Sequence, residues 1–474
     1  MPNNITGTLA KFSAELNFAD LPDNVIHEAK RGFLDTIGCA IGALEVDKGS
    51  IAVKFAKHMG GRKESTILGT GYRVSAPNAA FANGELMHAL DYTALLPPGH
   101  SAPYVTPSPL ALAEIRKSSG KNLITAIVLS HEIATRIGVS LGGFRLKNGK
   151  LARVFGMSYN VFGAAAGAGK IMGLNSDKMA DALGLAGYFA PIPSHQKFLF
   201  TTHNGMQKYG PSGWIAQGGL TAAILAEMGE RGDREVLDGD YGFWAMSGAE
   251  ECNWDVITRN LGKDWNMLQA KYKCWPCCGA MQSPLGAISK LVEDYDLKPE
   301  EIQQIVINSD DISSSPQFLK TEVDDHCEAQ NSLYYVMAAA FHRIKVGPEW
   351  QSRSNIDNPS IKALMKKIKH VPYPKAMEVK IQELKVEGKN YLNRRPSLVE
   401  VSARGKVFTQ SVDYAKWISA ETPEFRATDK NLADKFTANV EKVLEPEKLK
   451  TSIDMIMNLE KVKTTNELIK ALNP

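Results

Sequence analysis

Residues 88–100 of this 474-residue chain, HALDYTALLPPGH, combine four side chains that suit proton transfer. His88 and Asp91 lie at the predicted end of a helix, and Thr93 and His100 lie in the Pro-Pro-Gly loop that follows. Histidine titrates near neutral pH, and a carboxylate beside it can orient it or carry a proton. The stretch indicates either an acid–base site or a capped helix end, in which His88 and Asp91 share a helical face and bond to one another.

Two lysines elsewhere have neighbours that suit the binding of an anion. Lys208 lies between Gly205 and Gly210, directly before a predicted helix of small residues, where its ammonium is free to meet an anion. Lys273 precedes a Trp-Pro turn, and Gln282 follows at a predicted helix start, where backbone amides can hold an anion. The alternative for Lys208 is an ordinary solvated loop lysine.

Other motifs have a structural explanation. The three cysteines in KCWPCC, residues 273–278, suggest zinc, but no second Cys or His pair follows at ligand spacing, so we expect no metal site. The stretch GAGKIMGL lacks the spacing of a phosphate-binding loop, and no predicted strand precedes it. Tyr334 and Tyr335 lie in a predicted helix, where most tyrosines pack. None of these motifs is specific on its own.

The composition is that of an ordinary globular protein, with 44% hydrophobic and 23% charged residues and a formal net charge of +3. No run of Lys and Arg is dense enough for a nucleic-acid or membrane-surface segment. No apolar run approaches the roughly 20 residues that span a bilayer, and the polar start lacks the pattern of a signal peptide. Six cysteines are too few for a disulfide framework. We expect a cytoplasmic protein that binds neither nucleic acid nor membrane.

The elements that position these residues fall into two groups. Up to about residue 265 apolar residues recur at helical spacing, beginning with a helix at residues 23–45 for which Asp23 is the predicted N-cap. Gly and Ala repeat every three or four residues in segments 162–174, 182–190 and 212–232, which lets helix backbones approach closely. This part therefore predicts a tightly packed helical interior.

From about residue 270 the pattern changes. Strands are predicted where apolar and polar residues alternate, at residues 301–310, 377–386 and 397–412. Helices are predicted between them, at residues 278–295, 331–343 and 359–371. This mixture predicts a compact α+β domain.

The last part of the chain returns to a helical pattern and is too short to form a domain alone, so we expect it to pack on the first helices. The predicted fold class is mainly α with an α+β insertion: a large all-helical domain formed by both chain ends, plus a smaller α+β lid domain. The predicted boundaries are 1–268 for the helical domain, 269–406 for the lid and 407–474 for the returning helices. A small-ligand site is expected in the cleft between the two domains.

The order of the segments resembles the MmgE/PrpD family, which includes 2-methylcitrate dehydratase, cis-aconitate decarboxylase and an iminodisuccinate epimerase. Seven stretches carry the resemblance, in family order: LDTIGCAIGA, NGELMHALDYTALLPPGHSAPYVTPSPLALAE, FGAAAGAGKIMGL, MQKYGPSGWIAQGGLTAAILA, KCWPCCGAMQ, EAQNSLYYVMAAAF and TDKNLADKF. The resemblance implies a helical domain with an inserted lid, a homodimer, and activity on small di- or tricarboxylates without a metal or organic cofactor.

The resemblance also implies roles for individual residues. Asp91, His100 and Lys208 match the family's active-site aspartate, histidine and lysine and are the expected catalytic residues. The residues expected to bind substrate are Thr93, Arg153, Lys273, Gln282 and Tyr335, and His88 is expected to support the site. In such a site cations bind carboxylates and raise the acidity of an adjacent C–H, and a His or a carboxylate moves the proton.

The chain departs from the family pattern close to the site. DYTAL replaces the family's D-F-D-D-T, so one acidic pair is lost and Thr93 is displaced in register. The loop to His100 is about one residue short of the family's. Arg153 and Pro211 stand where family members have histidines. These differences leave the choice between methylcitrate and cis-aconitate chemistry open.

Three functions follow from these residues. The first is a cofactor-independent lyase, a dehydratase or decarboxylase, with His100 or Asp91 as acid or base and Lys208 as anion anchor. The second is an isomerase or epimerase of a related dicarboxylate, which returns the proton to carbon. The third is a non-catalytic, carboxylate-binding homodimer. The sequence favours the first, because Asp91, His100 and Lys208 are retained and the segments follow the family order. It disfavours the third, because the retained residues are scattered over both predicted domains.

Overall fold

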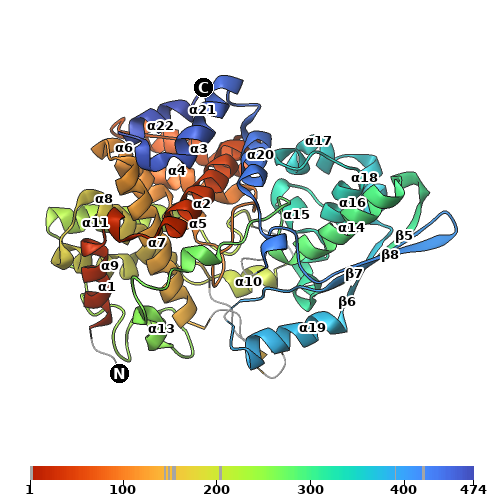
Figure 1. Ribbon diagram of the computed structural model, residues 1–474, viewed down its shortest axis with the longest axis horizontal. Coiled ribbons are helices and arrows are strands. Elements are labelled where there is room, and N and C mark those ends of the chain that lie inside the picture. Colours follow the sequence, from red (N-terminus) through yellow and green to blue (C-terminus); the bar gives the residue numbers. More distant parts are fainter. Residues whose placement is uncertain are drawn as a thin grey trace.

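The computed structural model describes residues 4–142, 146–147, 150–151, 156–201, 205–389, 391–418 and 422–474. Helices dominate these residues, and one small sheet lies at the far side from the N-terminus, as Figure 1 shows. The prediction of a mainly α protein with a small α+β part is confirmed.

The first part of the chain, up to about residue 270, consists mainly of helices. Its longer helices are α1 (Ile5–Glu15), α2 (Asp23–Gly42), α3 (Asp47–Met59), α4 (Ala76–Ala89), α6 (Pro107–Arg116), α7 (Gly120–Ser140), α8 (Asn160–Met172), α9 (Ser176–Phe189) and α11 (Ser212–Met228). Two short antiparallel ribbons lie between them, β1 (Ser65–Thr66) with β2 (Arg73–Val74) and β3 (Leu146–Lys147) with β4 (Lys150–Leu151). Asp23 is the first helical residue of α2 and Pro22 is the N-cap, so the predicted cap is wrong by one residue.

Small residues bring α7, α8 and α11 into close contact. A Cβ atom on Gly163 of α8 would lie 2.2 Å from the carbonyl oxygen of Ser130 in α7. One on Gly219 of α11 would lie 2.5 Å from the Cβ atom of Ala164 in α8. The predicted close approach of these helices is therefore confirmed, and α8 leaves no room for larger side chains on either side.

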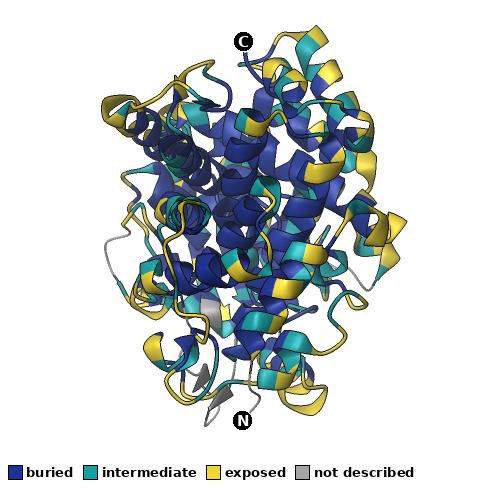
Figure 2. Ribbon diagram, turned by 90° about the vertical axis from the view of Figure 1, so that its left-hand side faces the viewer, coloured by how far each residue is buried: buried dark blue, intermediate teal, exposed yellow. Residues whose placement is uncertain are grey.

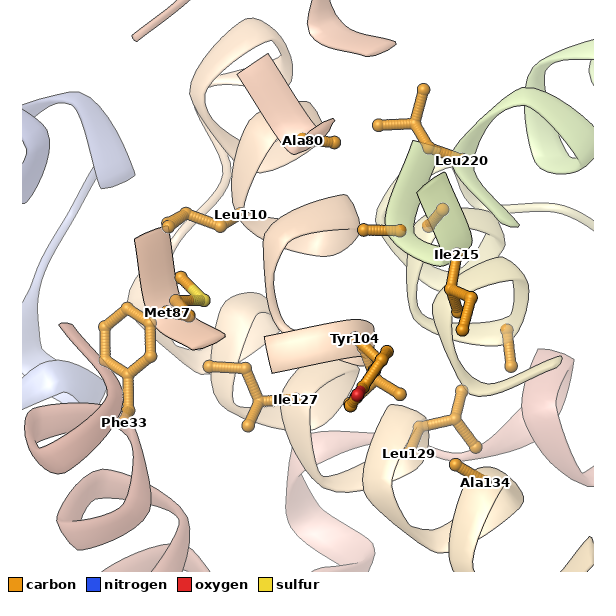
Figure 3. Close-up of a cluster of buried hydrophobic side chains, with 14 of the residues drawn as sticks. Phe33, Ala80, Met87, Tyr104, Leu110, Ile127, Leu129, Ala134, Ile215 and Leu220 are labelled. Carbon is orange, nitrogen blue, oxygen red and sulfur yellow. The ribbon is translucent and has the colours of Figure 1, made fainter. Parts of the chain in front are cut away.

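The interior of this helical part is filled by aliphatic and aromatic side chains. Figure 2 shows the central helices buried along most of their length. Figure 3 shows side chains from several helices meeting, among them Met87 of α4, Ile127 of α7 and Ile215 of α11. Among the described residues one helix, α7, has the length and apolar composition of a membrane-spanning segment, and that stretch is wholly buried inside the protein. Core helices have the same composition.

The second part of the chain contains a four-stranded sheet with the strand order β6-β5-β7-β8. The strands are β5 (Ile302–Ser309), β6 (Ile368–Pro372), β7 (Ser397–Ala403) and β8 (Lys406–Val412). β6 runs parallel to β5, and the other pairs are antiparallel. The longer helices of this part are α14 (Gln282–Tyr295), α15 (His326–Asn331), α16 (Leu333–Phe341), α18 (Pro359–Met365) and α19 (Pro374–Ile381), and α14 packs on the sheet. The predicted strand at 301–310 is confirmed, and the stretch predicted as strand at 397–412 forms two antiparallel strands, β7 and β8, joined by a turn at Arg404 and Gly405.

Two sequence predictions in this part are wrong. Residues 377–386 form the end of α19 and a π-helical turn (Gln382–Val386) instead of a strand. The buried residues in and next to this stretch are Ala376, Lys380 and Glu383, at helical spacing, whereas Val386 is exposed. Lys380 pairs with buried Asp310, and Glu383 pairs with half-buried Arg394. The helix predicted at 359–371 ends at Met365, because the following residues pair as an edge strand with β5.

The chain ends in α20 (Asp429–Val440), α21 (Pro446–Met457) and α22 (Thr465–Ala471), and α20 packs on α2 (Figure 1). Buried apolar side chains form two clusters. One contains residues between Ile5 and Tyr272 and between Ala427 and Leu472. The other contains residues between Cys274 and Ala403, with Leu199. The domain boundaries at 268 and 406 stay a prediction.

Candidate active site

A cavity of about 130 Å³ lies where the two apolar clusters meet. Its lining comes from the loop after α4, from residues near Tyr209, from the segment after Ala270 and from the segment around Arg395. The charged and titratable residues of the lining are Asp91, His100, His195, Tyr209, Lys271, Cys278, Tyr391 and Arg395. Most of the other described lining residues are apolar, so cations and histidines face a largely hydrocarbon-walled space.

Asp91 is the centre of a buried hydrogen-bond network at this cavity. α4 ends at Ala89, and Asp91 adopts a left-handed conformation with φ of 50°, which aspartate tolerates better than most residues. Its Oδ1 accepts hydrogen bonds from Lys273 Nζ at 2.9 Å and from the Tyr209 hydroxyl at 2.7 Å. Burial disfavours the charged form, but the two ammonium groups of Lys273 and Lys208 hold the pKa of Asp91 well below its usual range. Asp91 is therefore an ionised carboxylate and a weak base.

Lys208 lies behind Asp91 and does not line the cavity. Its Nζ donates to the carbonyl oxygen of His88 at 2.7 Å and to Oε1 of Gln330 at 2.9 Å, and lies 3.9 Å from Asp91 Oδ1. Burial is the main cause that lowers the pKa of Lys208 to about 8. The last carbonyl groups of a helix lack hydrogen-bond donors within the helix, and here Lys208 donates a hydrogen bond to one of them, that of His88. The ammonium of Lys208 is bound by the protein, so it is not a solvated loop lysine.

His100 is the sequence-predicted residue that faces the cavity most directly. Its ring stacks on Tyr209 with the ring centres 4.9 Å apart, and its Nε2 lies 3.8 Å from Asp91 Oδ1. Its Nδ1 has no hydrogen-bond partner among the described residues. Burial, followed by the charge of Lys273, lowers the pKa of His100 well below its ordinary value. The site therefore holds a neutral imidazole next to an ionised carboxylate.

His88 does not bond to Asp91 through its side chain, so the predicted pairing of the two is wrong. The physical reason is the end of the helix at Ala89, which takes Asp91 off the face that carries His88. The ring of His88 instead contacts Tyr104 and Tyr209. These contacts, and the hydrogen bond from Lys208 to its carbonyl oxygen, connect His88 to the residues around Asp91.

The structure brings Asp91, His100, Lys208 and Lys273 together, but it places three other predicted residues away from the cavity. Gln282 uses both ends of its amide on the Trp275 backbone and neighbouring groups, and the Tyr335 hydroxyl donates to the carbonyl of Trp350. Thr93 is buried and outside the lining. Arg153, also predicted to bind substrate, lies outside the described residues.

Polar lining residues that sequence reasoning missed include Tyr209, His195, Lys271 and Arg395. Tyr209 follows Lys208 directly, and that adjacency was the available signal. Lys271 Nζ is held by the carbonyl of Leu392 and the side chain of Asn393, and Arg395 Nη1 donates to Asp310 at 2.6 Å. The partners of these two cations lie more than 80 residues away in sequence, so local patterns gave no signal for them.

Burial of His131, in α7, is expected to make the folding stability of the protein depend on pH. Its Nδ1 bonds to Ser101, next to His100, and burial lowers its pKa to about 4. Between pH 6.5 and 4 the unfolded chain binds a proton that the folded chain does not, so folding stability is lost as pH falls through this range. We expect His131→Gln to remove roughly 2–3 kcal/mol of the decrease in unfolding free energy between pH 7 and pH 4.5. Urea unfolding of both proteins at the two pH values checks this, and equal decreases would contradict it.

Comparison with known proteins gives consistent matches over most of the chain. A family model described as the MmgE/PrpD N-terminal domain matches residues 7–254, and one described as the MmgE/PrpD C-terminal domain matches residues 275–461. A cis-aconitate decarboxylase of Aspergillus terreus is 28% identical over 340 residues, which cover 68% of this chain and 66% of that protein. The cis-aconitate decarboxylase of Homo sapiens is 26% identical over 472 residues, covering 94% of this chain and 89% of that protein. The match thus spans about two thirds of the fungal relative and most of the human one.

Proposed function

Because the chain belongs to the MmgE/PrpD family, as its sequence pattern predicted, we propose that it is a lyase that removes carbon dioxide or water from a small di- or tricarboxylate. The observation that carries the proposal is a neutral His100 facing a cavity beside an ionised, lysine-bound Asp91. The relatives named as cis-aconitate decarboxylases support decarboxylation as the first reaction to test.

His100 is the proposed proton carrier, and the charges at the cavity support this role. Asp91 holds its charge too tightly to act as a base near neutral pH, because Lys273 and Lys208 stabilise the carboxylate. A bound substrate brings its own negative charge next to His100, and that charge raises the pKa of the imidazole toward neutrality. Substrate binding therefore brings the pKa of His100 into the range in which the imidazole can act as an acid or a base. Asp91 stabilises the imidazolium that forms.

Both lyase reactions use the same imidazole. In a decarboxylation the bond to the carboxyl carbon breaks, its electron pair stays on the substrate, and imidazolium of His100 donates a proton to the carbon framework. In a dehydration neutral His100 takes the proton next to a carboxylate, and the C–H electron pair forms the new double bond. The imidazolium so formed gives its proton to the departing hydroxyl group, which leaves as water. Neither step, as proposed, routes through a metal or organic cofactor.

Lys271 and Arg395 are the proposed carboxylate anchors, in place of Lys208. Both line the cavity, whereas Lys208 lies outside its lining with Nζ bonded to His88 and Gln330. An arginine can bind a carboxylate through two parallel hydrogen bonds. Lys208 is proposed to act without contacting the substrate: it binds the carbonyl group of His88 at the end of α4 and stabilises the negative charge of Asp91.

The proposal is tested by a screen of small acids with the purified protein, followed by NMR. The panel contains cis-aconitate, 2-methylcitrate, citrate and alkyl-substituted dicarboxylates, the last because the described lining is largely apolar. We expect one acid to lose carbon dioxide or water at a rate above that of a protein-free control. Calorimetric binding of the acids without turnover of any would contradict the proposal and favour a non-catalytic carboxylate-binding protein.

An isomerase or epimerase is the second candidate function, and one observation favours it. His195 lines the same cavity as His100, and both rings lie beside Tyr209, with ring centres 5.2 Å and 4.9 Å away. Two imidazoles at one cavity suit removal of a proton by one and its return by the other. Recovery of substrate that carries solvent deuterium, without release of water or carbon dioxide, would select this reaction.

The finer architecture belongs to the same proposal. A helical domain made from both chain ends and an α+β lid would correspond to the two apolar clusters, with the cavity between them. A homodimer in the cytoplasm, as the resemblance and composition imply, completes this proposal. Light scattering of the purified protein at micromolar concentration tests the dimer, and a monomeric mass would contradict it.

A further inference from the structure

We propose that Asp35 and Lys435 are positioning residues that set the geometry of the Asp91–Lys273 ion pair. Both lie in stretches that carry the family resemblance, LDTIGCAIGA near the start of the chain and TDKNLADKF near its end. The proposed proton transfer uses neither residue. Neither lines the cavity, so any role that they have in the reaction acts through other groups.

The ammonium of Lys435 is bound on three sides. Its Nζ lies 2.7 Å from Asp35 Oδ1, and it donates to the carbonyl oxygens of Tyr92 at 2.7 Å and Lys273 at 3.0 Å. A lysine has three N–H donors, and three acceptors surround this one. Nζ also lies 3.6 Å from the centre of the Tyr92 ring. The side chains of Lys435 and Asp35 are 1% and 0% exposed, so water does not compete for these bonds.

The two carbonyls that Lys435 binds belong to the two halves of the candidate site. Tyr92 follows Asp91 directly, and the other carbonyl is that of Lys273 itself. Asp35 extends the same restraint, because its Oδ2 accepts a hydrogen bond from the backbone N–H of Ala94 at 2.8 Å. One buried ion pair therefore fixes the backbone on both sides of the Asp91–Lys273 contact.

The location of this pair explains why the site needs both ends of the chain. Asp35 lies in α2 and Lys435 in α20, and these helices pack on each other (Figure 1). Without Lys435, two buried carbonyls and a buried carboxylate would each lose a partner, and the segments around Asp91 and Lys273 would shift to find new ones. A shift of about 1 Å at a reacting group can cost roughly 100-fold in rate.

The activity test rests on the proposed function and compares Lys435→Met with Lys30→Met. Lys30 in α2 also forms an ion pair with the C-terminal part of the chain, 2.9 Å from Glu460, but it binds no residue of the site. We expect Lys435→Met to lower kcat about 100-fold with little change in KM. We expect Lys30→Met to lower the melting temperature and to leave kcat unchanged.

The pH profile separates positioning from general destabilisation. Loosening the contact with Lys273 raises the pKa of Asp91, because that ammonium is the largest charge that lowers it. The acid limb of the kcat profile should therefore move to higher pH in Lys435→Met and stay in place in Lys30→Met. A kcat of Lys435→Met within threefold of the wild type, or an unmoved acid limb, would overturn the proposal.

A crystal structure of the milder Asp35→Asn variant gives a readout that does not depend on turnover, and also serves if Lys435→Met does not fold. We expect the distance between Lys273 Nζ and Asp91 Oδ1 to lengthen from 2.9 Å to beyond hydrogen-bond range. An unchanged distance would overturn the proposal. If the wild type converts none of the acids but this distance lengthens, the proposed lyase function fails and the positioning role stands.

Discussion

Replacing His100 with glutamine is expected to lower kcat by about 10²–10⁴-fold while KM changes by only a few-fold. Glutamine keeps a polar side chain of similar length against Tyr209 but cannot carry a proton between pH 5 and 9. The lining of the cavity and the Asp91–Lys273 pair remain, so the substrate still binds. Steady-state kinetics with the acid that the wild type converts give both constants.

His195→Gln is the matched control, because this imidazole lines the same cavity and contacts the same tyrosine. A lyase that relies on His100 alone should lose far less activity in His195→Gln than in His100→Gln. Equal and large losses would instead support two proton carriers, as an epimerase requires. Full turnover by His100→Gln would remove this histidine from the mechanism.

Lys273→Met is expected to destabilise the protein by roughly 3–5 kcal/mol, because it leaves a buried carboxylate without its nearest cation. Lys273 is fully buried, and its Nζ binds both the side chain and the carbonyl oxygen of Asp91. Asp91 keeps its bond from Tyr209 and the nearby charge of Lys208, so the loss should lie toward the lower end of that range. Urea unfolding at pH 7 measures it.

A double-mutant cycle with Asp91→Asn tests the interaction itself. Once the carboxylate is neutral, removal of Lys273 no longer leaves an unpaired charge, so the double variant should be more stable than the sum of the single losses predicts. The coupling should also weaken at acidic pH. The lowered pKa of Asp91 contributes stability that is present above about pH 4 and is lost as the carboxylate is protonated. Strictly additive losses would show that the two residues do not interact.

The sequence predicted most of the helical part and two of the three proposed strands, because these elements have a clear period of burial. It failed at residues 377–386, where the period-2 pattern placed Val379 and Ile381 on an apparent core face. The face that the structure buries there contains Lys380 and Glu383, whose partners are Asp310, Asp311 and Arg394. Burial of paired charges leaves no apolar signature, so periodicity alone could not reveal the helix.

The candidate site was predictable only in part, for a related reason. Asp91 and His100 lie nine residues apart, so a local pattern could suggest both. Lys273 was a candidate from its own local sequence, but it lies 182 residues from Asp91, so no local pattern could predict that the two would pair. The orientation of a buried side chain depends on its neighbours in space, which is why Gln282 and Tyr335 turned out to bind backbone groups away from the cavity. Lys435 is a further case, since its partners become neighbours only after α20 packs on α2.

A crystal structure with a bound, unreactive carboxylate such as tricarballylate tests the central claim most directly. The account predicts that this ligand occupies the cavity between the two apolar clusters, with one carboxylate on Lys271 or Arg395. A ligand carbon next to a carboxylate should then lie within about 3–3.5 Å of a ring nitrogen of His100. A ligand bound elsewhere, or bound in the cavity with His100 turned away from it, would contradict the account.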